Sequence, residues 1–167
     1  YIHQRYDLPP GQKRPTAQHG SERFSANLDA FFGDRGHQVL AHPRYRLHII
    51  ASRGRHLLAR EHPLATPVGY LGAFASNALR RQAMGAWLER VVFSAPGADG
   101  AIRLPFGTHD FRTRSVRLTE ANFHPALQAS CSIPFVLQAV HDIPGAPRGA
   151  YWDGGITDYH LHLDYRP

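Results

Sequence analysis

The sequence predicts an α/β fold, in which helices layer as a sandwich against a largely parallel central sheet. Short segments rich in β-forming residues, at positions 45–51, 91–94 and 149–153, alternate with segments that have apolar residues at helical spacing. Such alternation is typical of α/β domains. The composition agrees, because 43% hydrophobic and 19% charged residues are the proportions of a globular chain with a buried core.

The chain has the length of one domain rather than two, at 167 residues. Residues 1–20 are predicted to be a loop or linker, and residues 21–167 the domain. Proline and glycine recur among polar residues in the first segment, at Pro9, Pro10, Gly11, Pro15 and Gly20. The chain begins at Tyr1 without a start methionine or an apolar signal segment, so we expect the domain to be incomplete at its N-terminus.

The first predicted helix covers residues 21–32. Its apolar residues recur at helical spacing, Ser21 is placed to cap it, and Gly33 is placed to end it. Residues 45–51 then predict a strand, because they are rich in β-forming residues and run into a turn at residues 52–54.

The remaining elements complete the alternation. Residues 67–90 predict a long helix that glycines bend or divide, and residues 91–94 a short strand. A further strand is expected at residues 116–118 and a short helix at residues 122–129. The last strand, at residues 149–153, leads directly into two glycines.

Arginine gives the chain its net charge of +6, since Lys13 is the only lysine. The arginines are spread along the chain, which favours a solvated surface, and we expect no nucleic-acid partner. Peripheral contact with an anionic membrane surface remains an alternative. No apolar run is long enough to span a bilayer.

The single cysteine, Cys131, cannot form an internal disulfide, which favours a reducing compartment. We therefore expect a cytoplasmic protein, with a peripheral membrane location as the alternative. No base or glycine turn is identifiable beside Cys131, so it is interpreted as a small buried packing residue.

The most informative triplet is Asp153-Gly154-Gly155, which stands at the end of the last predicted strand. Glycine permits a positive φ and a close approach of neighbouring backbone, so the carboxylate can be aimed out of the sheet. In open α/β sheets, ligands bind at this edge. Alone, the triplet also fits an ordinary turn.

A second segment precedes this triplet at short range: residues 129–134 read Ala-Ser-Cys-Ser-Ile-Pro at the end of a predicted helix. The combination resembles the C-terminal part of the patatin-like phospholipase family. The resemblance covers roughly residues 120–160 and implies a lipid acyl hydrolase that uses a Ser-Asp dyad. It implies that Asp153 is the catalytic base, that Gly154 and Gly155 support it, that the substrate is a lipid or acyl ester, and that no cofactor is needed.

The chain departs from that family in two respects. The family commonly places an asparagine and a proline a few residues after Asp-Gly-Gly, whereas here the run is Ile156-Thr157-Asp158. The family carries its nucleophilic serine in G-x-S-x-G and forms its oxyanion hole with an upstream glycine-rich loop, and this chain has neither motif. We therefore expect the serine to lie outside the chain, and the chain alone to be inactive. A non-catalytic patatin-like module that binds lipid or protein is the alternative.

Residues 156–165 are a second candidate for chemistry. As a strand, they would place Asp158, His160 and His162 on one face, together with Asp164. Such side chains are competent metal ligands, and with His124 or His141 they would suit a metal-dependent hydrolase. A solvent-facing polar stripe is the other interpretation, and the dyad scheme itself requires no metal.

Overall fold

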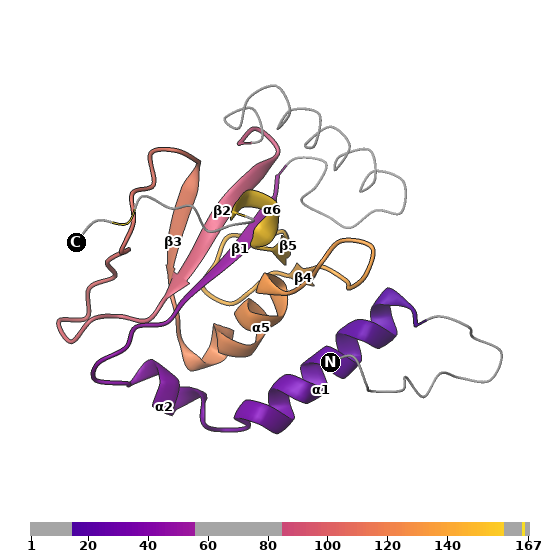
Figure 1. Ribbon diagram of the computed structural model, residues 1–167, viewed down its shortest axis with the longest axis horizontal. Helices are drawn as coiled ribbons and strands as arrows, with labels where there is room; N and C mark the ends of the chain where they lie inside the picture. The colour runs from indigo at the N-terminus through magenta and orange to yellow at the C-terminus, as the bar shows by residue number, and fades with distance from the viewer. Residues whose placement is uncertain (1–14, 56–84, 159–164, 166–167) are drawn as a thin grey trace.

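A computed structural model describes residues 15–55, 85–158 and 165 of the chain (Figure 1). The described helices are α1 (Ala17–Phe32), α2 (Gly36–Leu40), α5 (Glu120–Ser130) and α6 (Gly155–Asp158). The described strands are β1 (His48–Gly54), β2 (Leu88–Ser94), β3 (Thr113–Arg117), β4 (Val140–His141) and β5 (Ala150–Asp153). The mixed α/β class predicted from the sequence is confirmed.

The five described strands form one open sheet in the order β3-β2-β1-β5-β4. Only β2 and β3 pair in parallel, whereas β1 is antiparallel to both of its neighbours and β4 is antiparallel to β5. The prediction of a largely parallel sheet is therefore wrong. The prediction holds for three of the described strands, since β2, β3 and β5 all run in one direction. However, β1 runs the opposite way and lies between β2 and β5, which makes both of its pairings antiparallel.

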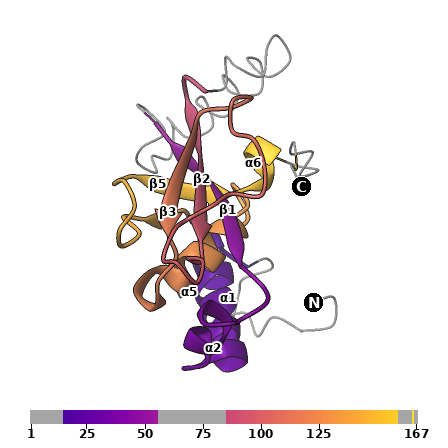
Figure 2. The same cartoon turned by 90° about the vertical axis from the view of Figure 1, so that its left-hand side faces the viewer.

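Helices cover both faces of this sheet. Phe123 of α5 shares a buried apolar core with Ile49 of β1 on one face. Outside α5 lies α1 (Figure 1). The rings of Phe32 and Phe123 meet edge to face, with 5.1 Å between their centroids. On the opposite face, Ile156 of α6 packs against Leu88, so that α6 lies beside β1 and β2 (Figure 2).

The first helix begins earlier than predicted. Thr16 is its N-cap, with the side-chain oxygen accepting a hydrogen bond from the His19 N–H at 3.2 Å, so the loop prediction is wrong from Ala17 onward. Ser21 lies inside the helix, where its hydroxyl accepts the Gln138 N–H at 2.8 Å. The predicted end is correct, since Gly33 is the C-cap with a φ of 52°. Residues 1–14 lie outside the described part of the chain.

The paired ends of β1 and β2 both extend beyond the predicted strands. The expected turn at residues 52–54 is the end of β1, because each of these residues pairs with β2. Correspondingly, β2 begins at Leu88, so the predicted helix cannot continue to residue 90. Residues 67–84 of that helix lie outside the described part. The two-residue strand β4 was not predicted, and it is too short to leave a sequence pattern.

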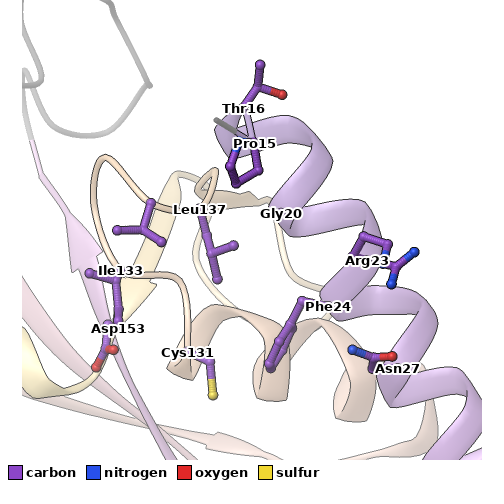
Figure 3. A pocket seen from close by; sticks show the side chains of 11 residues that line it. Pro15, Thr16, Gly20, Arg23, Phe24, Asn27, Cys131, Ile133, Leu137 and Asp153 are labelled. Atoms are coloured by element: carbon purple, nitrogen blue, oxygen red, sulfur yellow. The ribbon is translucent and has the colours of Figure 1, made fainter. Parts of the chain in front are cut away.

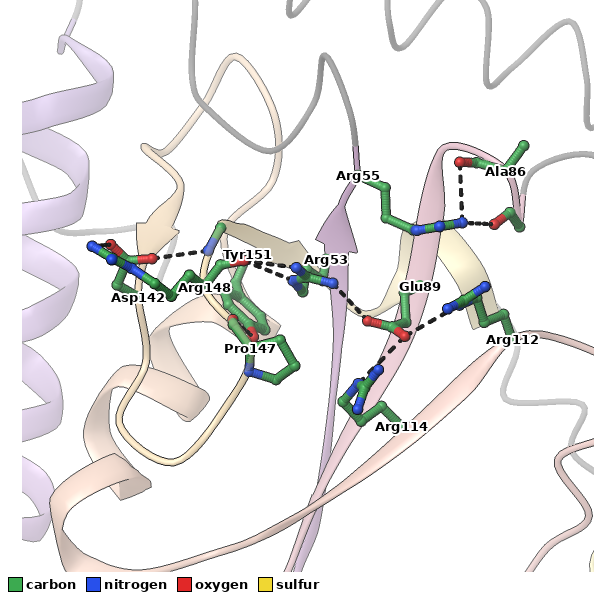
Figure 4. Close-up of polar contacts among 12 residues, drawn as sticks. Arg53, Arg55, Ala86, Glu89, Arg112, Arg114, Asp142, Pro147, Arg148 and Tyr151 are labelled. Atoms are coloured by element: carbon green, nitrogen blue, oxygen red, sulfur yellow. Dashed lines mark hydrogen bonds and ion pairs between the residues drawn. The ribbon is translucent and has the colours of Figure 1, made fainter.

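Two neighbouring residues of β2 carry charge to opposite faces of the sheet. Glu89 is buried and forms ion pairs with three arginines (Figure 4). The distances from its carboxylate oxygens are 2.8 Å to Arg53, 3.3 Å to Arg112 and 3.4 Å to Arg114. These contacts join β1, β2 and β3 across one face.

Arg90, on the other face, is fully buried. It donates two hydrogen bonds to Asp158 of α6, with Nε to Oδ2 at 2.6 Å and Nη2 to Oδ1 at 2.7 Å. Two further bonds, at 3.1 and 2.9 Å, reach the carboxylate of Asp110. Burial alone lowers the pKa of Arg90, but the hydrogen bonds with Asp158 and Asp110 raise it above its ordinary value, so the guanidinium stays charged.

We predict that Asp158→Asn lowers the free energy of unfolding by about 3 kcal/mol, because it removes one of the two carboxylates that neutralise a buried guanidinium. The size of the side chain is unchanged, so the loss reports charge rather than packing. Denaturant-induced unfolding followed by circular dichroism measures this difference.

Asp99→Asn is the matched control, since Asp99 pairs with Arg103 at 2.6 Å on the exposed surface. Solvent screens that pair, and we expect no measurable change in unfolding. Equal unfolding curves for the Asp158 and Asp99 variants would show that Arg90 does not hold α6 on the sheet.

Candidate active site at Asp153

Asp153 is the last residue of β5, where it stands opposite Ala51 of the central strand β1. Its main-chain N–H donates a hydrogen bond of 3.0 Å to the carbonyl of Ser132. The segment after α5 therefore runs beside the end of β5. Residues 129–134 and the Asp-Gly-Gly triplet, whose combination resembles the patatin-like family, are therefore in direct contact.

The turn after Asp153 orients its carboxylate. The Gly155 N–H donates to Asp153 Oδ1 at 2.6 Å, and the single-turn helix α6 starts at Gly155. The carbonyl of Gly154 accepts the N–H groups of Thr157 and Asp158 at 3.1 and 3.0 Å, which closes that turn. The carboxylate is thus held by its own turn at the point where the strand leaves the sheet.

Gly154 is required for space rather than for conformation. A Cβ at this position would lie 2.3 Å from the carbonyl oxygen of Ile50, far inside contact distance. Close backbone approach was one of the two expected reasons for the glycines, and for Gly154 it is confirmed. The other reason was wrong, because neither Gly154 nor Gly155 is among the described glycines with positive φ.

Two cavities meet at Asp153. The first, of about 410 Å³, lies between α1 and the segment that follows α5 (Figure 3). Its wall is largely apolar, with Phe24 from α1 and Leu137 from the facing segment. The second, of about 390 Å³, lies between the start of β1, the end of α5 and the Asp-Gly-Gly turn. No ion pair joins Asp153 to another described residue. Its carboxylate accepts the Gly155 N–H, and the residue lines both cavities.

Cys131 lines the first cavity and is exposed, so its interpretation as a buried packing residue is wrong. The helix ends at this position, which turns the side chain outward. Partial desolvation raises the pKa of the Cys131 thiol, and the negative charge of Asp153 raises it further. The thiol therefore stays protonated at neutral pH and is a poor nucleophile.

A serine and a histidine that sequence reasoning did not connect are joined across β1 and β2. His48 Nδ1 lies 2.9 Å from Ser94 Oγ, and His48 also lines the second cavity. Burial lowers the pKa of His48, which keeps the imidazole neutral. Ser94 is fully buried, however, so its hydroxyl cannot reach a substrate. Only the register of β1 and β2 places His48 opposite Ser94, so this contact could not be predicted from the sequence.

The predicted histidine face is not formed as expected. Residues 155–158 are helical, and Asp158 is buried against Arg90, so the strand that was to present Asp158 beside the histidines does not exist at this position. His160 and His162 lie outside the described residues. His124, one of the two residues considered as a further ligand, pairs with Asp29 of α1 at 2.9 Å. Across residues 15–55, 85–158 and 165, no group of three or more potential metal ligands occurs.

Chemically, the arrangement can bring a carboxylate to a hydroxyl group that enters either cavity. No described serine hydroxyl is hydrogen-bonded to the Asp153 carboxylate, which accepts the Gly155 N–H. Of the helices in the described part, none is long and apolar enough to cross a membrane.

Comparison with known proteins gives no match to a family model, to a curated protein or to a solved structure.

We predict that Gly154→Ala destabilises the fold by about 2–3 kcal/mol, because its Cβ must push against the β1 backbone. Gly100→Ala is the control: it has a φ of 75° but nothing within 4 Å of an added Cβ, so it loses only about 1 kcal/mol through strain. Thermal unfolding of both variants makes the comparison. A smaller effect at Gly154 than at Gly100 would contradict the close approach.

A second prediction concerns the charge of Asp153. Because that charge raises the Cys131 pKa, Asp153→Asn lowers this pKa and increases the thiolate fraction at any given pH. Alkylation of Cys131 by iodoacetamide at pH 8 is therefore expected to be faster in the variant. Asp142→Asn, which removes a carboxylate that does not line this cavity, leaves the rate unchanged. Identical rates for wild type and Asp153→Asn would mean that the carboxylate does not act on the thiol.

Proposed function

We propose that this chain is part of a patatin-like lipid acyl hydrolase in which Asp153 is the base of a Ser-Asp dyad. The nucleophilic serine is supplied by a segment outside these 167 residues. The patatin-like layering of the domain belongs to the same proposal. One observation carries it: Asp153 ends a strand and lines an apolar cavity, with its carboxylate held by the Gly155 N–H.

The form of the cavity supports a substrate with an apolar part. Its volume of about 410 Å³ lies in the range of small-molecule sites, and such sites combine apolar walls with a few placed polar groups. Here the polar groups include Asp153 at one position and Arg23 and Asn27 on α1 (Figure 3). An acyl chain would pack between Phe24 and Leu137, with its ester toward Asp153.

In the proposed reaction, Asp153 takes the proton of the serine hydroxyl as the serine oxygen attacks the ester carbonyl. Since Oδ1 accepts the Gly155 N–H, Oδ2 is the oxygen assigned to this proton. The carboxylic acid then gives the proton to the leaving alcohol, and an acyl-enzyme remains. Water hydrolyses the acyl-enzyme with the same carboxylate as base, which restores serine, releases the fatty acid and completes the cycle.

We predict that Asp153→Asn in the full-length protein lowers the rate of p-nitrophenyl ester hydrolysis by about 10²–10⁴-fold, because an amide cannot accept the serine proton. Asp142→Asn is the matched control. Asp142 accepts the Gly149 N–H at 2.9 Å, and an asparagine side-chain oxygen can accept the same bond. The link between β4 and β5 is therefore preserved, and hydrolysis is expected to continue. Unfolding curves of both variants verify that the fold is intact.

A fluorophosphonate probe, which labels activated serines, separates this proposal from a non-catalytic binding module. The full-length protein is expected to be labelled, whereas its Asp153→Asn variant and the 167-residue chain alone are not. Full hydrolysis by Asp153→Asn would refute the dyad. Absence of labelling in the full-length protein would favour the module that binds lipid or protein without reaction.

A further inference from the structure

An exposed apolar turn stands at the rim of the cavity that Asp153 lines. Three of its four residues are large apolar side chains with high solvent exposure: 50% for Ile133, 70% for Phe135 and 59% for Val136. Ile133 and Val136 also line the cavity itself. The turn lies within a run of ten uncharged residues, from Cys131 to Val140.

The backbone of this turn is strained at its most exposed residue. Phe135 has a φ of 67°, in the left-handed region that bulky side chains rarely adopt. Such strain persists where the surrounding structure enforces it, and it concentrates at functional positions. Here it holds a phenyl ring that remains 70% exposed to solvent.

Both ends of the segment are anchored, so the turn is a defined protrusion. Before it, the Ser132 carbonyl accepts the Asp153 N–H at 3.0 Å, and after it the Gln138 N–H donates to Ser21 Oγ at 2.8 Å. Within the turn, Leu137 N–H donates to the Ile133 carbonyl at 2.9 Å. The apolar tip is therefore held by hydrogen bonds to β5 on one side and to α1 on the other.

We infer that the 133–136 turn is a membrane-docking element that inserts into the interface of an anionic phospholipid bilayer. A protein partner suits it less well, because a specific protein interface takes about 20 residues from each side and this turn offers four. Interfacial insertion needs only a few apolar side chains together with electrostatic attraction to anionic lipid. The chain's net charge of +6 supplies that attraction, and Arg23 lies at the same cavity.

Docking in this orientation would open the cavity toward the bilayer, so that a lipid reaches Asp153 without crossing water. This last consequence depends on the proposed hydrolase function, whereas the membrane contact itself does not. The two are therefore tested with different readouts.

The test is co-sedimentation of the full-length protein with vesicles of ether-linked phospholipids, which have no ester to hydrolyse. We expect binding to vesicles that contain ether-linked phosphatidylserine and weaker binding to phosphatidylcholine alone. Phe135→Gly is expected to weaken binding about tenfold, the factor expected when the burial of one aromatic side chain is lost. Because glycine relieves the strained φ, the unfolding midpoint should stay the same or rise, which separates lost binding from misfolding.

Phe31→Ala is the matched control, because Phe31 on α1 is also 70% exposed but does not line the cavity. Its binding should equal that of the wild type. Phe135→Trp should bind as the wild type does and show an indole emission shifted to the blue on vesicles. Equal binding by Phe135→Gly and the wild type, or no binding by the wild type, would overturn the inference.

The outcomes for the two proposals remain distinct. Phe135→Gly should still hydrolyse a water-soluble p-nitrophenyl ester, since Phe135 does not line the cavity. Vesicle binding that depends on Phe135, in a protein without esterase activity, would support the membrane contact and reject the hydrolase.

Discussion

Arg90 places a permanent positive charge inside the sheet, and the surrounding structure is arranged to neutralise it. A buried guanidinium without partners would be strongly unfavourable, so its two carboxylates must be delivered by other parts of the chain. Asp158 comes from α6 and Asp110 from the loop before β3. Arg90 thereby joins β2 to α6, the helix that follows Asp153, across 68 residues of the chain.

The candidate site depends on this connection through a short path. Asp158 fixes the end of α6, the carbonyl of Gly154 closes its single turn, and the Gly155 N–H holds Asp153 Oδ1. Gly154 in turn lies so close to Ile50 that the turn cannot move toward β1. A four-residue helix has little stability of its own, so the position of the carboxylate follows from the buried ion pair and from the contact with β1.

The sequence predicted what depends on local pattern and missed what depends on distant partners. Gly33 ends α1 and Asp153 ends β5, as glycine placement and the last β-rich segment indicated. The direction of β1 could not be predicted, because it is set by which strands flank it. The alternating polar residues around Asp158 predicted a strand face, but the same residues also fit a short helical turn, which is what forms. Nothing local in the sequence reveals Arg90 as the partner of Asp158.

The segment from Ser130 to Gln138 shows how one stretch of chain can serve two separate roles. Its buried part, at Ser132, holds the backbone of Asp153, while its exposed part carries Phe135 at a strained φ. The bond from Leu137 to Ile133 closes the exposed turn on itself. A change at the tip is therefore contained within the turn, and the carboxylate keeps its position. Local closure of this kind would allow the proposed membrane-docking turn to vary without disturbing the proposed catalytic carboxylate beside it.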